Sequence, residues 1–89
     1  MIVKIDKTFE KDVDKIKDKI LLNKIADCIE IAQKSEDISS IKNIKKLKGS
    51  NSFYRIRIGD YRLGIIWENN SILFIRCLHR KDIYKYFPK

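Results

Sequence analysis

Residues 53–67 read FYRIRIGDYRLGIIW, in which apolar and polar residues alternate on both sides of a Gly-Asp pair. This alternation predicts two half-buried strands, and the Gly-Asp pair fits the two-residue turn of a β-hairpin. Counting outward from that turn sets Arg57 directly opposite Arg62, with Arg55 two positions further along the same face. The stretch therefore predicts a hairpin with one apolar face and one face lined by arginine.

The arginines on this face break a local rule of sheet stability, because like charges directly across a sheet destabilise it. One explanation is that the cations only protect an exposed sheet, a role for which lysine is the usual choice. The other is that guanidinium groups bind phosphate in a bidentate way and stack on bases. Gly64, which the count sets opposite Arg55, leaves room for something to approach the backbone and favours the second explanation.

Composition indicates the same class of partner. The chain has 89 residues and a net charge of +8, and all five of its arginines lie after residue 50. A chain of this length has room for one core, so we expect a single domain over residues 1–89 with its function on the surface. A strongly basic surface favours a polyanion, and nucleic acid is the first candidate.

The rest of the chain completes an α+β pattern. Two helical patterns follow a short strand, and a second two-residue turn, Asn-Asn, extends the hairpin to a three-stranded meander. The predicted elements are a strand at 2–5, a helix with Phe9, Val13 and Ile16 on one face, a helix from about Asp18 to Lys34, strands at 53–58, 61–68 and 71–79, and a short helix within 82–87. In this βααβββ order, a two-helix hairpin packs on one face of a small, mostly antiparallel sheet.

Residues 35–52 form the one long predicted loop, which is rich in lysine. Its lysines include Lys45, Lys46 and Lys48. They are either solubilising charge or a basic edge beside the hairpin that steers phosphate toward it.

The third strand of the meander runs into a second group of candidate residues. Counting through the Asn-Asn turn places these side chains on the arginine face: Leu73, Ile75, Cys77 and His79. His79, Arg80 and Tyr84 then combine a group that titrates near neutrality, a cation and an aromatic ring. These are ingredients for binding single-stranded RNA and for cleaving it. A structural histidine and a packing tyrosine are the simpler alternatives.

Other classes of protein and site are disfavoured. No apolar run is long enough to span a bilayer and the N-terminus lacks the pattern of a secretory signal, so we expect a cytoplasmic protein with no membrane partner. Cys28 and Cys77 lack metal-binding spacing, which favours reduced thiols in or near the core over a disulfide or a metal role. The single histidine also argues against zinc.

Three segments resemble a known family: KKLKG at 45–49, YRIRIGDYRLGII at 54–66 and LHRKDIY at 78–84. Together with the βααβββ order, they resemble the RelE branch of the RelE/ParE toxin superfamily of bacterial and archaeal toxin–antitoxin modules. The resemblance implies a toxin of a type II module, an endoribonuclease that cleaves mRNA in the ribosomal A site and inhibits translation. It further implies attack by the 2′-hydroxyl on the adjacent phosphate, no metal or other cofactor, and a RelB-like antitoxin as partner.

The resemblance also assigns roles to residues. The expected catalytic residues are Arg57, Arg62, His79, Arg80 and Tyr84, and the expected RNA-binding residues are Arg55, Lys45, Lys46 and Lys48. The best-studied branch has lysine where this chain has Arg55 and Arg57. A lysine can lose its proton in a crowded cationic site, whereas a guanidinium with a pKa above about 12 practically cannot. His79 is therefore the candidate general acid or base.

Two alternatives from other classes remain open. The ParE branch shares the fold but poisons DNA gyrase by binding it, without a ribonuclease site. A catalytically inactive RNA-binding or co-repressor homologue would use Arg55 and Arg57 only to bind phosphate. The filled basic and aromatic positions favour the RelE branch.

Overall fold

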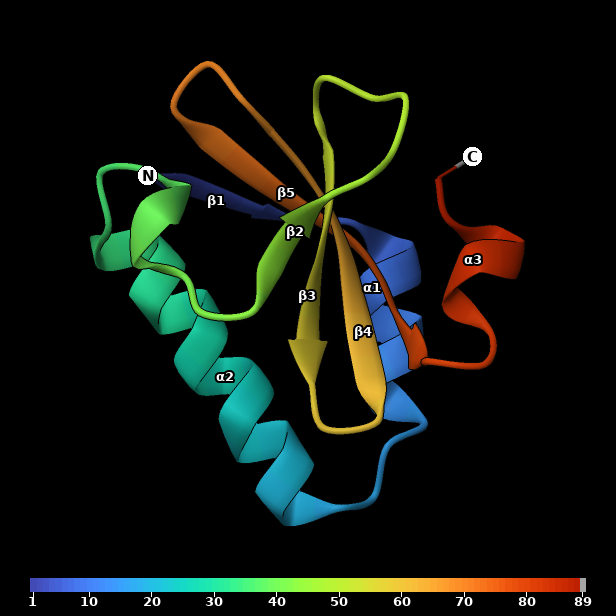
Figure 1. Ribbon diagram of the computed structural model, residues 1–89. Helices are drawn as coiled ribbons and strands as arrows, with labels where there is room; N and C mark the ends of the chain where they lie inside the picture. The colour runs from blue at the N-terminus through green and yellow to red at the C-terminus, as the bar shows by residue number, and fades with distance from the viewer. Residues whose placement is uncertain (89) are drawn as a thin grey trace.

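The computed structural model describes residues 1–88 and shows an α+β fold (Figure 1). Its elements are β1 (Ile2–Ile5), α1 (Lys7–Asp14), α2 (Lys19–Lys34), a 3-10 turn (Ile38–Ser40), β2 (Ile44–Lys46), β3 (Phe53–Ile58), β4 (Tyr61–Glu68), β5 (Ser71–His79) and α3 (Ile83–Tyr86). The predicted order of a strand, two helices, three strands and a short final helix is confirmed. Within the described part of the chain, no helix has the length and apolar character needed to cross a membrane.

The strands form one mixed sheet in the order β1-β5-β4-β3-β2, in which β1 runs parallel to β5 and the other neighbours are antiparallel. The β3–β4 hairpin has the predicted register, with Arg57 opposite Arg62 and Arg55 opposite Gly64. In the turn between these strands Gly59 has a φ of 57°, which glycine adopts without strain. The hairpin predicted from the alternating stretch therefore occupies the middle of the sheet.

Strand β2 lies within the segment that the sequence predicts as a loop, and that prediction is wrong for its three residues. Ile44–Lys46 pairs with β3 at the edge of the sheet. The residue before it, Asn43, has a φ of 60°, so the chain turns sharply into the strand. Lys45 lies opposite Arg55, and because side chains alternate along a strand, Lys46 lies on the other face.

Helices α1 and α2 cover the apolar face of the sheet. Asp6 and Asp18 each accept hydrogen bonds from main-chain N–H groups in the first turn of the helix that follows. Phe9 of α1 packs edge-to-face against Phe74 of β5, with ring centroids 5.4 Å apart. Ile16, which the spacing predicts within the first helix, follows its last residue and is still buried.

Helix α3 lies on the opposite side of the β3–β4 hairpin from α2 (Figure 1). Phe87, which follows it, is 2% exposed and packs edge-to-face on Phe53. A Cβ atom at Gly64 would come within 2.7 Å of the Phe87 ring. The close approach that Gly64 predicts is therefore made by the C-terminal segment of the chain itself, which covers one part of the arginine face and leaves Arg57 exposed.

Strand β5 contains a β-bulge that changes which of its side chains face which side. Ile75 has no partner on β4, because the residues on either side of it pair with consecutive β4 residues. The pairs before the bulge include Ile66 with Leu73, and the pairs beyond it include Leu63 with Cys77 and Tyr61 with His79. Leu73 lies on the arginine face as predicted. The predicted placement of Cys77 and His79 there is wrong, since one extra residue reverses the alternation and puts both on the helix-covered face.

Candidate functional site

Cations from four segments of the chain gather on one side of the sheet, and we call them the cationic face: Lys45, Arg55, Arg57, Arg62 and Arg80. Two pairs are directly opposed across neighbouring strands, Arg57 with Arg62 and Arg55 with Lys45. Like charges in such positions destabilise a sheet. The fold therefore concentrates positive charge where a bound anion would relieve the repulsion.

Arg62 is held by the turn of its own hairpin. Its Nη1 donates hydrogen bonds to the main-chain oxygens of Gly59 and Tyr61, both at 3.0 Å. Burial lowers the pKa of the Arg62 guanidinium, and the charges of Arg55 and Arg57 lower it further. A cation whose charge its neighbours already disfavour gains more from an anionic ligand than an isolated surface arginine does.

Arg80 and Tyr84 reach the same region from the end of β5. The main-chain N–H of Arg80 donates to the main-chain oxygen of Asp60 at 2.7 Å, which fastens this residue to the hairpin turn. The Arg80 side chain is 60% exposed and its Nε lies 3.9 Å from the Asp60 carboxylate, so the ion pair is weak and leaves the charge available. Tyr84, in α3, is 62% exposed.

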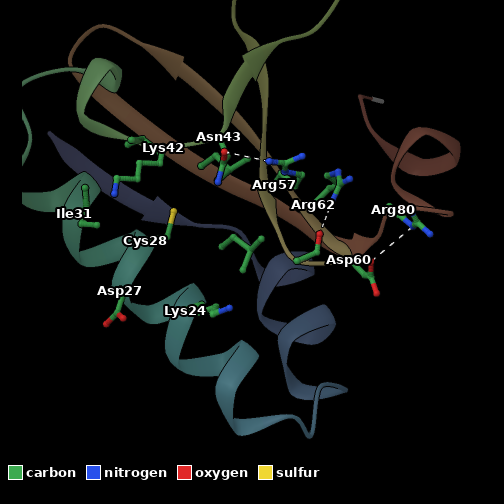
Figure 2. A pocket seen from close by; sticks show the side chains of 14 residues that line it. Lys24, Asp27, Cys28, Ile31, Lys42, Asn43, Arg57, Asp60, Arg62 and Arg80 are labelled. Carbon is green, nitrogen blue, oxygen red and sulfur yellow. Dashed lines mark hydrogen bonds and ion pairs between the residues drawn. The ribbon is translucent and has the colours of Figure 1, made fainter.

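A groove of about 640 Å³ opens beside the cationic face, between α2 and the β3–β4 hairpin (Figure 2). Arg57, Arg62 and Arg80 line one side of it, and lysines from α2 and from the segment before β2 also reach it. Apolar side chains and Cys28 complete the lining. Burial raises the pKa of the Cys28 thiol to about 11, so this thiol stays protonated and unreactive near neutral pH.

His79 does not join the cationic face. Its ring packs edge-to-face on Tyr61 with centroids 5.7 Å apart, on the other side of the sheet. Its Nδ1 accepts a hydrogen bond from the main-chain N–H of Lys81 at 3.1 Å, so the neutral ring carries its proton on Nε2. The contact supports the turn that carries Arg80.

Of the three lysines predicted to bind RNA, Lys45 is the one that lies on the cationic face. Lys46 lies on the other face of the sheet, and Lys48 is exposed in the segment after β2. No three His, Cys, Asp or Glu side chains within residues 1–88 gather into a group able to hold a metal ion.

Asn43 was not predicted as a site residue, although it contacts both arginines of β3. Its main-chain oxygen accepts a hydrogen bond from Arg55 Nη1 at 3.2 Å, and its Oδ1 accepts one from Arg57 Nη2 at 3.4 Å. Asparagine adopts positive φ more readily than most residues, so its presence in a predicted loop was the available signal for a sharp turn here.

A family of known proteins and a curated relative match nearly the whole of this chain. Residues 3–84 match the family described as ParE toxin of type II toxin-antitoxin system, parDE. The chain is 45% identical to Toxin RelE3 of Methanocaldococcus jannaschii over 89 residues, which are 99% of this chain and 100% of the relative. Putative toxin RelE1 of the same organism is 38% identical over 48% of this chain and 50% of its own.

Solved structures share the fold, and two of them are toxin-antitoxin complexes. A chain in the crystal structure of the RelB-RelE antitoxin-toxin complex from Methanococcus jannaschii matches with a TM-score of 0.81 and 42% identity, covering 96% of this chain and 99% of that one. A chain in the toxin-antitoxin complex RelBE2 from Mycobacterium tuberculosis has a TM-score of 0.65 at 22% identity, covering 91% and 92%, and shows the fold alone. From the family match and the full-length relative, this chain belongs to the RelE/ParE superfamily of toxins from type II toxin–antitoxin systems.

Proposed function

We propose that this toxin is an endoribonuclease that cleaves mRNA in the A site of the ribosome and so inhibits translation. The observation that supports this most directly is the opposition of Arg57 and Arg62 beside Arg80. Within residues 1–88, no ion pair joins a carboxylate to Arg55, Arg57 or Arg62. These guanidinium groups therefore keep their charge available for a phosphate.

In the proposed reaction, the 2′-hydroxyl of one nucleotide attacks the phosphorus of the phosphate that follows it. The bond from phosphorus to the 5′-oxygen of the next nucleotide breaks, which leaves a 2′,3′-cyclic phosphate and a 5′-hydroxyl. Negative charge grows on the nonbridging oxygens, where Arg57 and Arg62 would bind, and on the leaving oxygen, where Arg80 would bind. A preorganised donor aimed at developing charge is worth about 100-fold in rate or more, so these side chains supply the positive charge without a metal ion.

The remaining predicted residues would position the RNA. Arg55 lies two residues from Arg57 on β3, and Lys45 lies opposite Arg55 on the neighbouring strand β2. These two cations would bind a flanking phosphate. The exposed ring of Tyr84 would stack on or orient a base near the cleaved bond. Lys46 and Lys48 would contribute to the general attraction of RNA rather than to a defined contact.

We propose His79 as the group that transfers the proton, although its ring lies away from the cationic face. Because the ring lies on the helix-covered face, His79 would have to act through water or after the turn at 79–82 rearranges. A general acid or base leaves a pH-dependent limb in the single-turnover rate that disappears in His79→Gln. An unchanged profile in this variant would restrict His79 to supporting the turn that carries Arg80.

Primer extension on an mRNA in a reconstituted translation mixture tests the proposed reaction. We expect new ends within the A-site codon when ribosomes are present and none on the same mRNA without them. Arg62→Ala should give no cut, because it removes the central guanidinium. Equal cleavage of free mRNA would contradict the need for the ribosome, and intact mRNA on ribosomes would contradict the reaction itself.

A RelB-like antitoxin is the partner we propose, because the matched Methanococcus jannaschii structure is a RelB-RelE antitoxin-toxin complex. The excess of cations favours an acidic, helical segment that covers the cationic face or displaces α3. A structure of the complex in which both regions stay open to solvent would contradict this mode of inhibition.

Two other functions have some support, and each predicts that the protein leaves mRNA uncut. The matched family bears the name of the ParE toxin, so gyrase poisoning is the second candidate. In that case the purified protein would inhibit supercoiling by DNA gyrase and mRNA would stay intact. The third candidate is an inactive RNA-binding or co-repressor homologue, which is compatible with arginine in place of lysine at positions 55 and 57. Such a protein would bind RNA without cutting it.

A further inference from the structure

We propose that Asn43 is a positioning residue that holds the two arginines of β3 in place without cancelling their charge. The inference rests on the proposed function, because Arg55 and Arg57 are phosphate-binding groups of that same site. It adds to them a neutral residue from the neighbouring segment, the turn that leads into β2.

Asn43 contacts both arginines at once because of its backbone conformation. With a φ of 60°, its main-chain oxygen turns back toward β3 and accepts hydrogen bonds from the main-chain N–H of Arg57 at 3.1 Å and from Arg55 Nη1 at 3.2 Å. Its side-chain Oδ1 accepts a third bond, from Arg57 Nη2 at 3.4 Å, which Figure 2 shows as a dashed line. One residue thus joins the two guanidinium groups to the start of β2.

The two arginines need such a contact because their other neighbours repel them. Arg55 lies opposite Lys45 and Arg57 lies opposite Arg62, so each guanidinium faces a like charge across the sheet. Long side chains under repulsion spread over many rotamers, and that freedom must be lost again when a phosphate binds. Acceptors on Asn43 reduce this freedom before the substrate arrives.

A neutral acceptor also suits the chemistry better than a carboxylate would. An amide or main-chain oxygen takes one donor from each guanidinium and leaves the net charge of both groups intact. Each guanidinium has five N–H donors, so several remain for phosphate oxygens. An aspartate in the same place would hold Arg57 more strongly but would oppose its attraction for RNA.

Asn43→Gly is the sharpest test, because glycine keeps the positive φ and the main-chain oxygen and removes Oδ1 alone. We expect the saturated single-turnover rate of mRNA cleavage on ribosomes to fall about tenfold, while affinity for ribosomes changes less than twofold. Asn69→Gly is the matched control, since Asn69 has a φ of 50° in the β4–β5 turn, away from the cationic face. It should cleave at the wild-type rate.

Asn43→Asp tests the neutrality of Asn43 separately from its hydrogen bond to Arg57. The carboxylate has the shape of the amide but adds a negative charge beside Arg57. We expect the slope of log affinity against log salt concentration to decrease by about one, because one fewer counterion is displaced, and RNA affinity at low salt to fall several-fold. Asn43→Gly should keep the wild-type slope.

An NMR measurement on the free protein keeps this inference distinct from the proposed function. In Asn43→Gly the Nε–Hε group of Arg57 should lose order on the picosecond-to-nanosecond timescale, whereas that of Arg62, which donates to its own turn, should not change. If the wild-type toxin fails to cut mRNA, the proposed function fails and this readout alone decides the role of Asn43. Unchanged Arg57 order, or equal cleavage by Asn43→Gly and Asn69→Gly, would overturn the inference.

Discussion

Arg62 and Arg76 lie on adjacent strands and on the same face of the sheet, with similar intermediate exposure, yet their surroundings differ in charge. Arg76 donates from Nε and Nη2 to the carboxylate of Asp12 at 2.8 and 3.2 Å, and its guanidinium lies 5.4 Å from the centre of the Tyr86 ring. Arg62 donates to main-chain oxygens of its own turn and faces Arg57 across the hairpin. One arginine is neutralised by the fold and the other is not.

This difference separates a structural arginine from a site arginine more clearly than exposure does. Asp12 also accepts a hydrogen bond from the main-chain N–H of Cys77 at 2.9 Å, so the Asp12–Arg76 pair joins α1, β5 and, through the Tyr86 ring, α3. The charge of Arg76 is thus balanced within the chain. The charge of Arg62 has no such partner in the described residues and is left for a ligand.

The largest effect is expected when Arg76 loses its counter-ion. Asp12→Ala should lower the free energy of unfolding by about 3 kcal/mol or more. The change leaves the partly buried Arg76 guanidinium without a counter-ion and the Cys77 N–H without its acceptor. Urea denaturation measures the loss. The double variant Asp12→Ala with Arg76→Met should recover part of it, because no unpaired charge remains. A single variant as stable as the wild type would remove the distinction between the two arginines.

Arg62→Ala should have the opposite effects, a large loss of cleavage rate and almost no loss of stability. The saturated single-turnover rate of mRNA cleavage on ribosomes should fall about 100-fold or more, because a donor to the developing charge is lost. The free energy of unfolding should stay within about 0.5 kcal/mol of wild type, since the change also removes repulsion. Arg80→Ala should act in the same direction. Wild-type rates in both variants would make the cationic face a docking surface and would remove the ribonuclease proposal.

The parts of the fold that sequence predicts correctly are those fixed by local patterns. The bounds of β3, β4 and β5 and the pairing of Arg57 with Arg62 follow from apolar alternation and from two-residue turns, which set the register of a hairpin without reference to the rest of the chain. The capped helices follow from apolar spacing in the same way.

The parts that sequence does not predict depend on distant contacts or on one inserted residue. The Asp12–Arg76 pair spans 64 positions, and neither residue stands out in its own segment. The bulge at Ile75 has no local signature, yet it decides that His79 faces away from the cationic face. Strand β2 has three residues, too few for an alternating pattern, so the face that Lys45 occupies could be seen only in the sheet.

Lys45 and Lys46 allow a cation on the cationic face to be compared with one off it, because they are adjacent in sequence and lie on opposite faces of the sheet. Lys45→Ala should reduce the slope of log RNA affinity against log salt concentration by about one, with little change in the saturated cleavage rate. Lys46→Ala is the matched control, with the same loss of net charge and a smaller change in slope. Equal slopes in the two variants would mean that overall charge, not the face, attracts the RNA.

The smallest expected effect concerns Cys77, whose main-chain N–H binds Asp12. Burial, with a smaller contribution from the Asp12 charge, raises the pKa of the Cys77 thiol from its usual 9.0 to about 12. Because the pKa is raised in the folded state, the unfolded thiol loses its proton first, and the stability from this group is present below pH 9 and declines as the pH rises toward 12.

Between pH 8 and pH 10, this thiol should therefore cost the wild type about 1 kcal/mol of unfolding free energy, measured by urea denaturation at each pH. Cys77→Ala should start from a lower stability because it leaves a small cavity, but its decline over the same range should be smaller by that amount. Asp12→Asn should keep most of the decline, since burial is the larger cause of the raised pKa. Identical declines in the wild type and Cys77→Ala would mean that the thiol reaches solvent. The region around the Asp12–Arg76 pair would then be open to solvent, as the cationic face is.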